Sequence, residues 1–137
     1  MLSLSLRIAG LVILALAAAY PIYPRYFRWR EELQAVSLLT RQIFFVHCGF
    51  IVLLLVLQGI LLVAAPDALL DASTAALALL VGMTAFWVYR LVAQLFIYDR
   101  KLWVGHRLNT VVHVVFTAIW CYLSGVFGWA LWHQMTA

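Results

Sequence analysis

Residues 43–64 read IFFVHCGFIVLLLVLQGILLVA, an apolar stretch without a charged side chain. About 20 such residues in an α-helix are long enough to cross the hydrocarbon core of a bilayer. Lipid offers no hydrogen-bond partners to the backbone, so a helix is the structure expected there. The stretch therefore predicts a transmembrane helix, which ends before Pro66.

Three further stretches of the same kind cover residues 4–20, 73–98 and 108–132, and either Asp71 or Ser73 is placed to cap the second of them. The chain of 137 residues is 67% hydrophobic and only 10% charged. A soluble domain of this length cannot bury that much apolar surface. We expect an all-α fold, an integral membrane four-helix up-down bundle that forms a single transmembrane domain over residues 1–137.

The basic residues predict an orientation. The connections before residues 43 and 108 carry Arg25, Arg28, Arg30, Arg41, Arg100, Lys101 and Arg107, whereas residues 65–72 carry two aspartates and no basic residue. The positive-inside rule places the two basic connections in the cytoplasm and both termini outside it, in a cell's inner (plasma) membrane. This orientation is opposite to that of a signal peptide, so we expect the alanine-rich first stretch to remain as a helix.

The connection before residue 43 has two interpretations. Residues 28–40 mix charged and apolar side chains. They either form a short amphipathic helix on the membrane surface or extend the following transmembrane helix toward its N-terminus.

Two stretches of the chain resemble each other and suggest a repeat. Residues 41–50 (RQIFFVHCGF) and 107–116 (RLNTVVHVVF) share an arginine, then Val-His, then a phenylalanine at the same spacing. They predict two repeated helical hairpins. Each histidine follows its arginine by six residues, about 9 Å along a helix. In an up-down bundle these helices are diagonal partners, so we expect His47 and His113 to face each other at one depth.

Arg90 is the most unusual residue of the apolar stretches. It lies about 12 Å before the end of its predicted helix, and no acidic residue lies inside any of the four stretches. A charge at that depth costs on the order of 2–3 kcal/mol unless it finds a partner or reaches the headgroups. Its side chain therefore either snorkels to the membrane surface or finds a partner. The candidate partners are backbone carbonyls, Tyr89, Tyr98, or an anionic group from outside the chain such as a phosphate or propionate.

The polar residues near the cytoplasmic edge form the candidate site: Arg41, His47, Arg90, Gln94, Tyr98, Arg107 and His113. The simplest interpretation is interhelical hydrogen bonding. Alternatively, His47 and His113 ligate the iron of a b-type haem, with Arg41, Arg90 or Arg107 on its propionates. A third hypothesis is a site for a quinone or a lipid headgroup. A bare metal ion fits least, because no carboxylate lies at that depth.

These observations favour a small inner-membrane subunit or binding module, with electron transfer if haem is bound. The alternatives are a structural or assembly subunit without a cofactor, and a small quinone- or lipid-handling enzyme. The chain has no Gly-rich phosphate loop, no CxxC pair and no HExxH motif, which argues against a separate enzyme. Its net charge of +4 comes from residues beside apolar spans, which argues against nucleic acid. We expect membrane lipid, and another membrane protein or a second copy of the chain, as partners.

Overall fold

The computed structural model describes residues 1–136, except for the side chain of Arg100. Four long helices, α1 (Leu2–Ala19), α4 (Leu38–Ala64), α5 (Thr74–Val92) and α6 (Arg107–Thr136), account for most of this range. Short helices connect them: α2 (Ile22–Tyr26), α3 (Trp29–Glu32), η1 (Leu33–Ala35), η2 (Pro66–Leu69), η3 (Ala93–Ile97) and η4 (Arg100–Leu102). No strand is present in residues 1–136, so the all-α prediction is confirmed.

All four long helices are long and apolar enough to span a membrane, as the sequence predicts. Many of their large apolar side chains are exposed on the surface of the protein, including Phe50, Leu57 and Leu108. Water would make such a surface unfavourable, whereas acyl chains solvate it. The surface is therefore that of a membrane protein.

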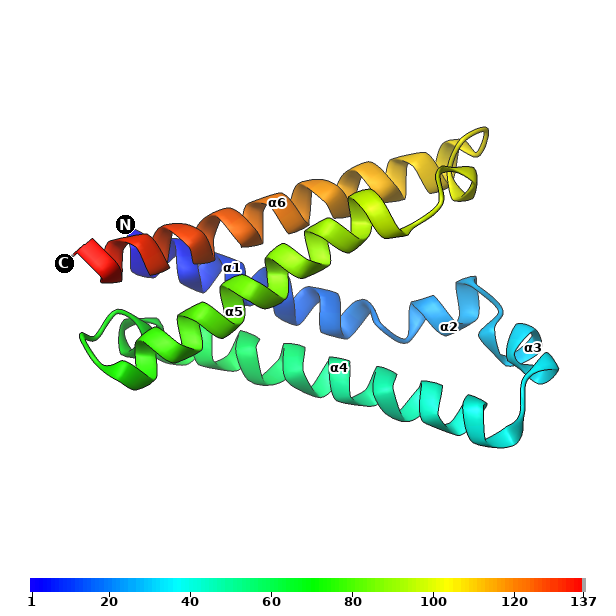
Figure 1. Ribbon diagram of the computed structural model, residues 1–137, viewed down its shortest axis with the longest axis horizontal. Coiled ribbons are helices and arrows are strands. Elements are labelled where there is room, and N and C mark those ends of the chain that lie inside the picture. The colour runs from blue at the N-terminus through cyan, green and yellow to red at the C-terminus, as the bar shows by residue number, and fades with distance from the viewer. Residues whose placement is uncertain (137) are drawn as a thin grey trace. The chain divides into compact units, whose positions relative to one another are not determined.

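The chain divides into two compact units, which are described in turn: Leu6–Pro66, and Met1–Ser5 together with the residues from Asp67 on. In the first unit, α1 and α4 run antiparallel (Figure 1). Two glycines let the helices approach closely. A Cβ at Gly10 would lie 3.0 Å from the backbone oxygen of Gly59 and 2.8 Å from the Cβ of Leu62. The Arg7 guanidinium also donates a 2.7 Å hydrogen bond to the Val63 carbonyl.

In the connection before α4, the interpretation as an N-terminal extension of that helix holds for residues 38–42. Residues 22–35 form the short helices α2, α3 and η1, whereas α4 begins at Leu38 rather than at residue 43. Ser37 caps α4, because its hydroxyl accepts a hydrogen bond from the Thr40 backbone N–H at 3.2 Å. The Trp29 ring packs edge-on against Phe44 of α4, with 4.9 Å between ring centroids, and holds α3 on that helix.

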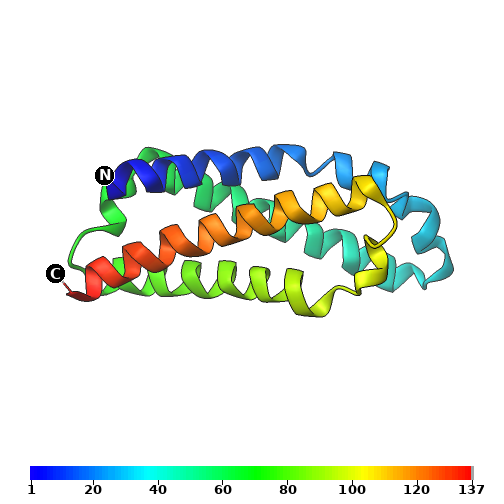
Figure 2. The ribbon, with the colours of Figure 1, turned by 90° about the horizontal axis from the view of Figure 1, so that it is seen from above.

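In the second unit, α5 and α6 run antiparallel, as Figures 1 and 2 show. Ser73, one of the two caps expected from the sequence, accepts a hydrogen bond from the Ala76 backbone N–H at 3.1 Å and begins α5. Midway along the pair, the buried Trp87 of α5 stacks on the buried Trp120 of α6, with 5.5 Å between centroids. Large flat side chains, rather than glycines, therefore set the distance between α5 and α6 in that region.

The glycine contact of the first unit predicts the effect of a single methyl group. Gly10→Ala places a Cβ against the backbone oxygen of Gly59 and the Cβ of Leu62, neither of which can move aside. We therefore expect the free energy of unfolding to fall by about 1–3 kcal/mol. Gly49→Ala on α4 is the matched control, because a Cβ there meets nothing within 4 Å. Thermal unfolding in detergent measures both variants. Equal melting temperatures for the two would contradict the close approach of α1 and α4.

Candidate functional site

The seven predicted site residues are shared between the two units. Arg90, Gln94, Tyr98, Arg107 and His113 belong to the α5–α6 unit, whereas Arg41 and His47 lie on α4 in the other unit. The structure joins Arg90, Gln94, Tyr98 and His113 into one connected group. The pairing of His47 with His113 stays a prediction.

A local change of helix type precedes the loop between α5 and α6. After Val92 the chain continues as one π-helical turn, η3, in which the Tyr98 backbone N–H donates to the Ala93 carbonyl at 3.3 Å. A π-turn holds one residue more than an α-helical turn and is often found at functional sites. Gln94 lies in this turn and is 6% exposed. Its amide must therefore be satisfied by neighbouring side chains, because burying it unpaired would be costly.

Gln94 satisfies that requirement with three partners. Its carbonyl oxygen accepts hydrogen bonds from the Arg90 guanidinium at 3.3 Å and from the Trp120 indole N–H at 3.4 Å. Neither of those partners can accept a hydrogen bond, so the amide can adopt only one orientation. Its NH₂ group then faces Nδ1 of His113, at 2.7 Å. Because an NH₂ group donates, His113 Nδ1 accepts, and the imidazole is neutral with its proton on Nε2.

Aromatic rings surround the charge on Arg90. Its guanidinium lies 4.7 Å from the centroid of Trp120 and 5.6 Å from that of Tyr98. Each such contact stabilises a cation by about 0.5–2 kcal/mol, which offsets much of the cost of its depth. No carboxylate pairs with Arg90 in the part of the chain that the structure describes. The hydrogen bond to Gln94 directs the side chain toward the C-terminal end of α5, the direction that snorkelling requires.

Trp103 and Trp120 also belong to this group, although neither is among the site residues predicted from the sequence. Trp103, in the loop before α6, stacks on the His113 ring with 3.9 Å between centroids and 12° between planes. The Thr110 hydroxyl donates to the Trp103 carbonyl at 2.8 Å and holds the loop against α6. Trp120 follows His113 by seven residues, a spacing that places both on one helix face and could have identified it. No comparable spacing signal exists for Trp103.

Arg107 lies apart from these contacts. It begins α6 and lines an open pocket of about 500 Å³ with Gly105, His106, Thr110 and Val111. Gly105 has a positive φ of 88°, which glycine adopts without strain, so this residue allows the chain to turn into α6. Arg107 is exposed there and gives the edge of the unit a positive charge.

His47 has a different environment from His113. Its ring is exposed on α4, and Nδ1 lies 2.8 Å from the carbonyl oxygen of Ile43, one turn earlier. A carbonyl only accepts, so Nδ1 carries the proton, and in the neutral imidazole the Nε2 lone pair is left available. Metal-bound histidines commonly use this arrangement, with Nδ1–H on a backbone carbonyl. Within residues 1–136, no group of three His, Cys, Asp or Glu residues is placed to hold a metal ion.

The two histidines are therefore expected to be opposite tautomers. ¹⁵N NMR of protein labelled at histidine, at a pH above 8, should report the proton of His47 on Nδ1 and that of His113 on Nε2. Gln94→Leu removes the donor to His113 Nδ1 and should produce a mixture of tautomers at His113, with no change at His47. Identical tautomers at the two positions in the unsubstituted protein would contradict the hydrogen-bond assignments.

Comparison with known proteins finds no matching family model, no similar curated protein and no similar solved structure. The side chains around Gln94 and the basic edges of the two units are therefore the basis for assigning a function.

Proposed function

We propose that this protein is a small membrane-embedded binding subunit and that the group around Gln94 binds a lipid-soluble ligand with a carbonyl oxygen, of the quinone class. One observation carries the proposal. The bond from Gln94 to His113 Nδ1 leaves Nε2–H as a hydrogen-bond donor, and the same amide binds a guanidinium without a carboxylate partner. A quinone oxygen accepts from such donors, and more strongly as it gains negative charge on reduction.

The surroundings of His113 support this ligand class. Trp103, Trp120 and Tyr98 supply flat apolar faces close to the donors, and an aromatic ring can stack on them. Binding sites for small molecules combine such apolar walls with a few placed polar groups. Tyr98 is 44% exposed, which makes this edge of the group accessible from outside the helix pair.

A haem-binding subunit is the second candidate, and the geometry of His47 favours it. With Nδ1–H on the Ile43 carbonyl, the Nε2 lone pair of His47 suits an iron ligand. Haem ligation by His113 as well requires its Nε2 to lose the proton, and therefore requires the Gln94 amide to give up the contacts with Arg90 and Trp120. The quinone proposal needs no such rearrangement.

The quinone proposal is tested by removing the donor and keeping the ring. His113→Phe preserves a flat side chain against Trp103 but loses Nε2–H. It should weaken binding of a short-chain ubiquinone or menaquinone analogue about tenfold, the usual value of one hydrogen bond. Quenching of tryptophan fluorescence in nanodiscs measures the affinity. His133→Phe, near the end of α6, is the matched control and should bind as the unsubstituted protein does.

Two results would point elsewhere. Unchanged quinone affinity in His113→Phe, together with a lower melting temperature, would assign the group a purely structural role in helix packing. A Soret band in protein prepared with ample haem, lost in His47→Ala, would favour the haem candidate.

We also propose an up-down order of four membrane spans, built as two repeated hairpins, with both termini outside the cytoplasm of an inner membrane. The basic residues at the ends of the α1–α4 and α5–α6 connections support this orientation. Alkaline phosphatase, which is active only outside the cytoplasm, should be active when fused after α6 and inactive when fused within residues 100–106. The reverse pattern would overturn the orientation.

A further inference from the structure

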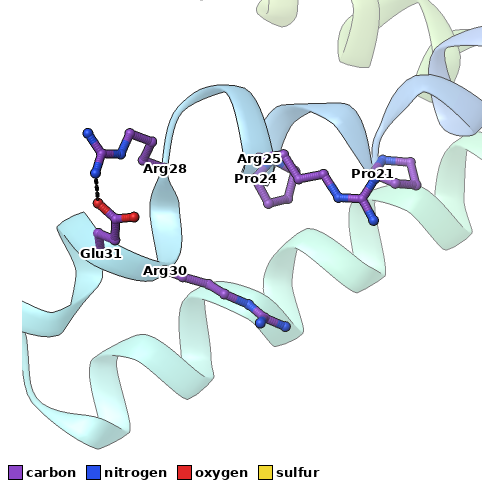
Figure 3. A pocket seen from close by; sticks show the side chains of 6 residues that line it. All are labelled: Pro21, Pro24, Arg25, Arg28, Arg30 and Glu31. Atoms are coloured by element: carbon purple, nitrogen blue, oxygen red, sulfur yellow. Dashed lines mark hydrogen bonds and ion pairs between the residues drawn. The ribbon is translucent and has the colours of Figure 1, made fainter.

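A pocket of about 430 Å³ lies on the connection between α1 and α4, away from the residues around Gln94 in the sequence. Figure 3 shows its lining: Pro21, Pro24, Arg25, Arg28, Arg30 and Glu31. Three guanidinium groups and one carboxylate thus surround a space large enough for a small anionic group. The excess of positive charge indicates an anionic ligand.

The single carboxylate of this pocket is already paired. Glu31 forms an ion pair with Arg28, drawn as the dashed line in Figure 3. In that view the side chains of Arg25 and Arg30 extend away from this ion pair. Neither of them is paired with a carboxylate in residues 1–136. Their two guanidinium groups are therefore the free donors of the pocket.

Rigid backbone and aromatic packing hold these donors in place. The rings of Pro21 and Pro24 limit the backbone of α2. Arg28 adopts a left-handed conformation, φ 50°, which non-glycine residues rarely adopt, and this conformation separates α2 from α3. Trp29 then packs edge-on against both Tyr20 and Phe44. Tryptophan and tyrosine concentrate at the membrane–water interface, so this packing sets the arginines at headgroup depth.

We infer that this pocket binds the phosphate group of an anionic phospholipid, with Arg25 and Arg30 as the donors. The guanidinium group matches phosphate oxygens with two parallel N–H donors, which an ammonium group cannot do. The choice of a lipid over a soluble phosphate rests on the neighbouring side chains. Ile22 is 62% exposed and Phe27 is 47% exposed beside the pocket, and such apolar groups suit the glycerol and upper acyl region of a lipid.

The ion pair between Arg28 and Glu31 has a role in this site. Unpaired, Glu31 would repel a phosphate or compete with it for Arg25 and Arg30. Paired with Arg28, the carboxylate is neutralised and leaves the other two guanidinium groups for the ligand.

Native mass spectrometry of the purified protein tests the inference. Protein is titrated with phosphatidylglycerol and, separately, with phosphatidylcholine, whose headgroup carries a compensating positive charge. The unsubstituted protein should retain phosphatidylglycerol at least tenfold more strongly. Arg25→Gln/Arg30→Gln should lose that preference, whereas Arg25→Lys/Arg30→Lys, which keeps the charge, should retain part of it and so separate charge from any loss of folding.

Arg41→Gln/Lys101→Gln is the matched control. It removes the same number of positive charges from residues that do not line this pocket, so phosphatidylglycerol binding should stay within about twofold of the unsubstituted protein. Equal retention by Arg25→Gln/Arg30→Gln and by this control would overturn the site. Displacement of the lipid by inorganic phosphate at millimolar concentration would overturn its assignment to a lipid and would identify a site for the free anion.

Discussion

Hydrocarbon offers a peptide group no hydrogen-bond partner, so each apolar stretch of this chain must satisfy its backbone within its own helix. Most features of the structure follow from this constraint. The long helices end where the chain can meet other partners, at Pro66 and at the loops that carry the charged residues. Where the α-helical pattern changes near the end of α5, it changes to a π-turn that keeps its backbone bonded, as the bond from Tyr98 to Ala93 shows.

Polar side chains within the helices must also find their hydrogen-bond partners inside the protein, and they find them in other side chains. Arg90 has no carboxylate within reach in the described chain, and its charge is met by an amide oxygen and two aromatic faces. Gln94 serves Arg90, Trp120 and His113 at once, and this triple role decides which nitrogen of His113 carries the proton. A contact between α5 and α6 thus also sets which ring nitrogen of His113 can donate a hydrogen bond.

The basic residues outside the helices are not part of these hydrogen-bonded contacts. Arginines at a membrane edge orient a chain during insertion, whatever their later contacts. In the connection between α1 and α4, packing on Trp29 additionally collects three of them around one pocket. In the sequence these arginines indicate only an orientation. In the structure Glu31 is paired with Arg28, so the guanidinium groups of Arg25 and Arg30 are left as hydrogen-bond donors of the pocket.

Sequence alone was sufficient for the four apolar helices, because length and hydropathy are local properties, and it narrowed the cap of α5 to Asp71 or Ser73. It also singled out Arg90, Gln94 and His113, which the structure joins by hydrogen bonds. The spacing of four between Arg90 and Gln94 places the two side chains on one helix face. Trp103 could not be predicted, since a loop residue reaches His113 only through the turn that the bonds of Thr110 stabilise. The tautomers of His47 and His113 could not be predicted from the sequence either. The position of each proton depends on which acceptor or donor the folded chain brings to each ring nitrogen.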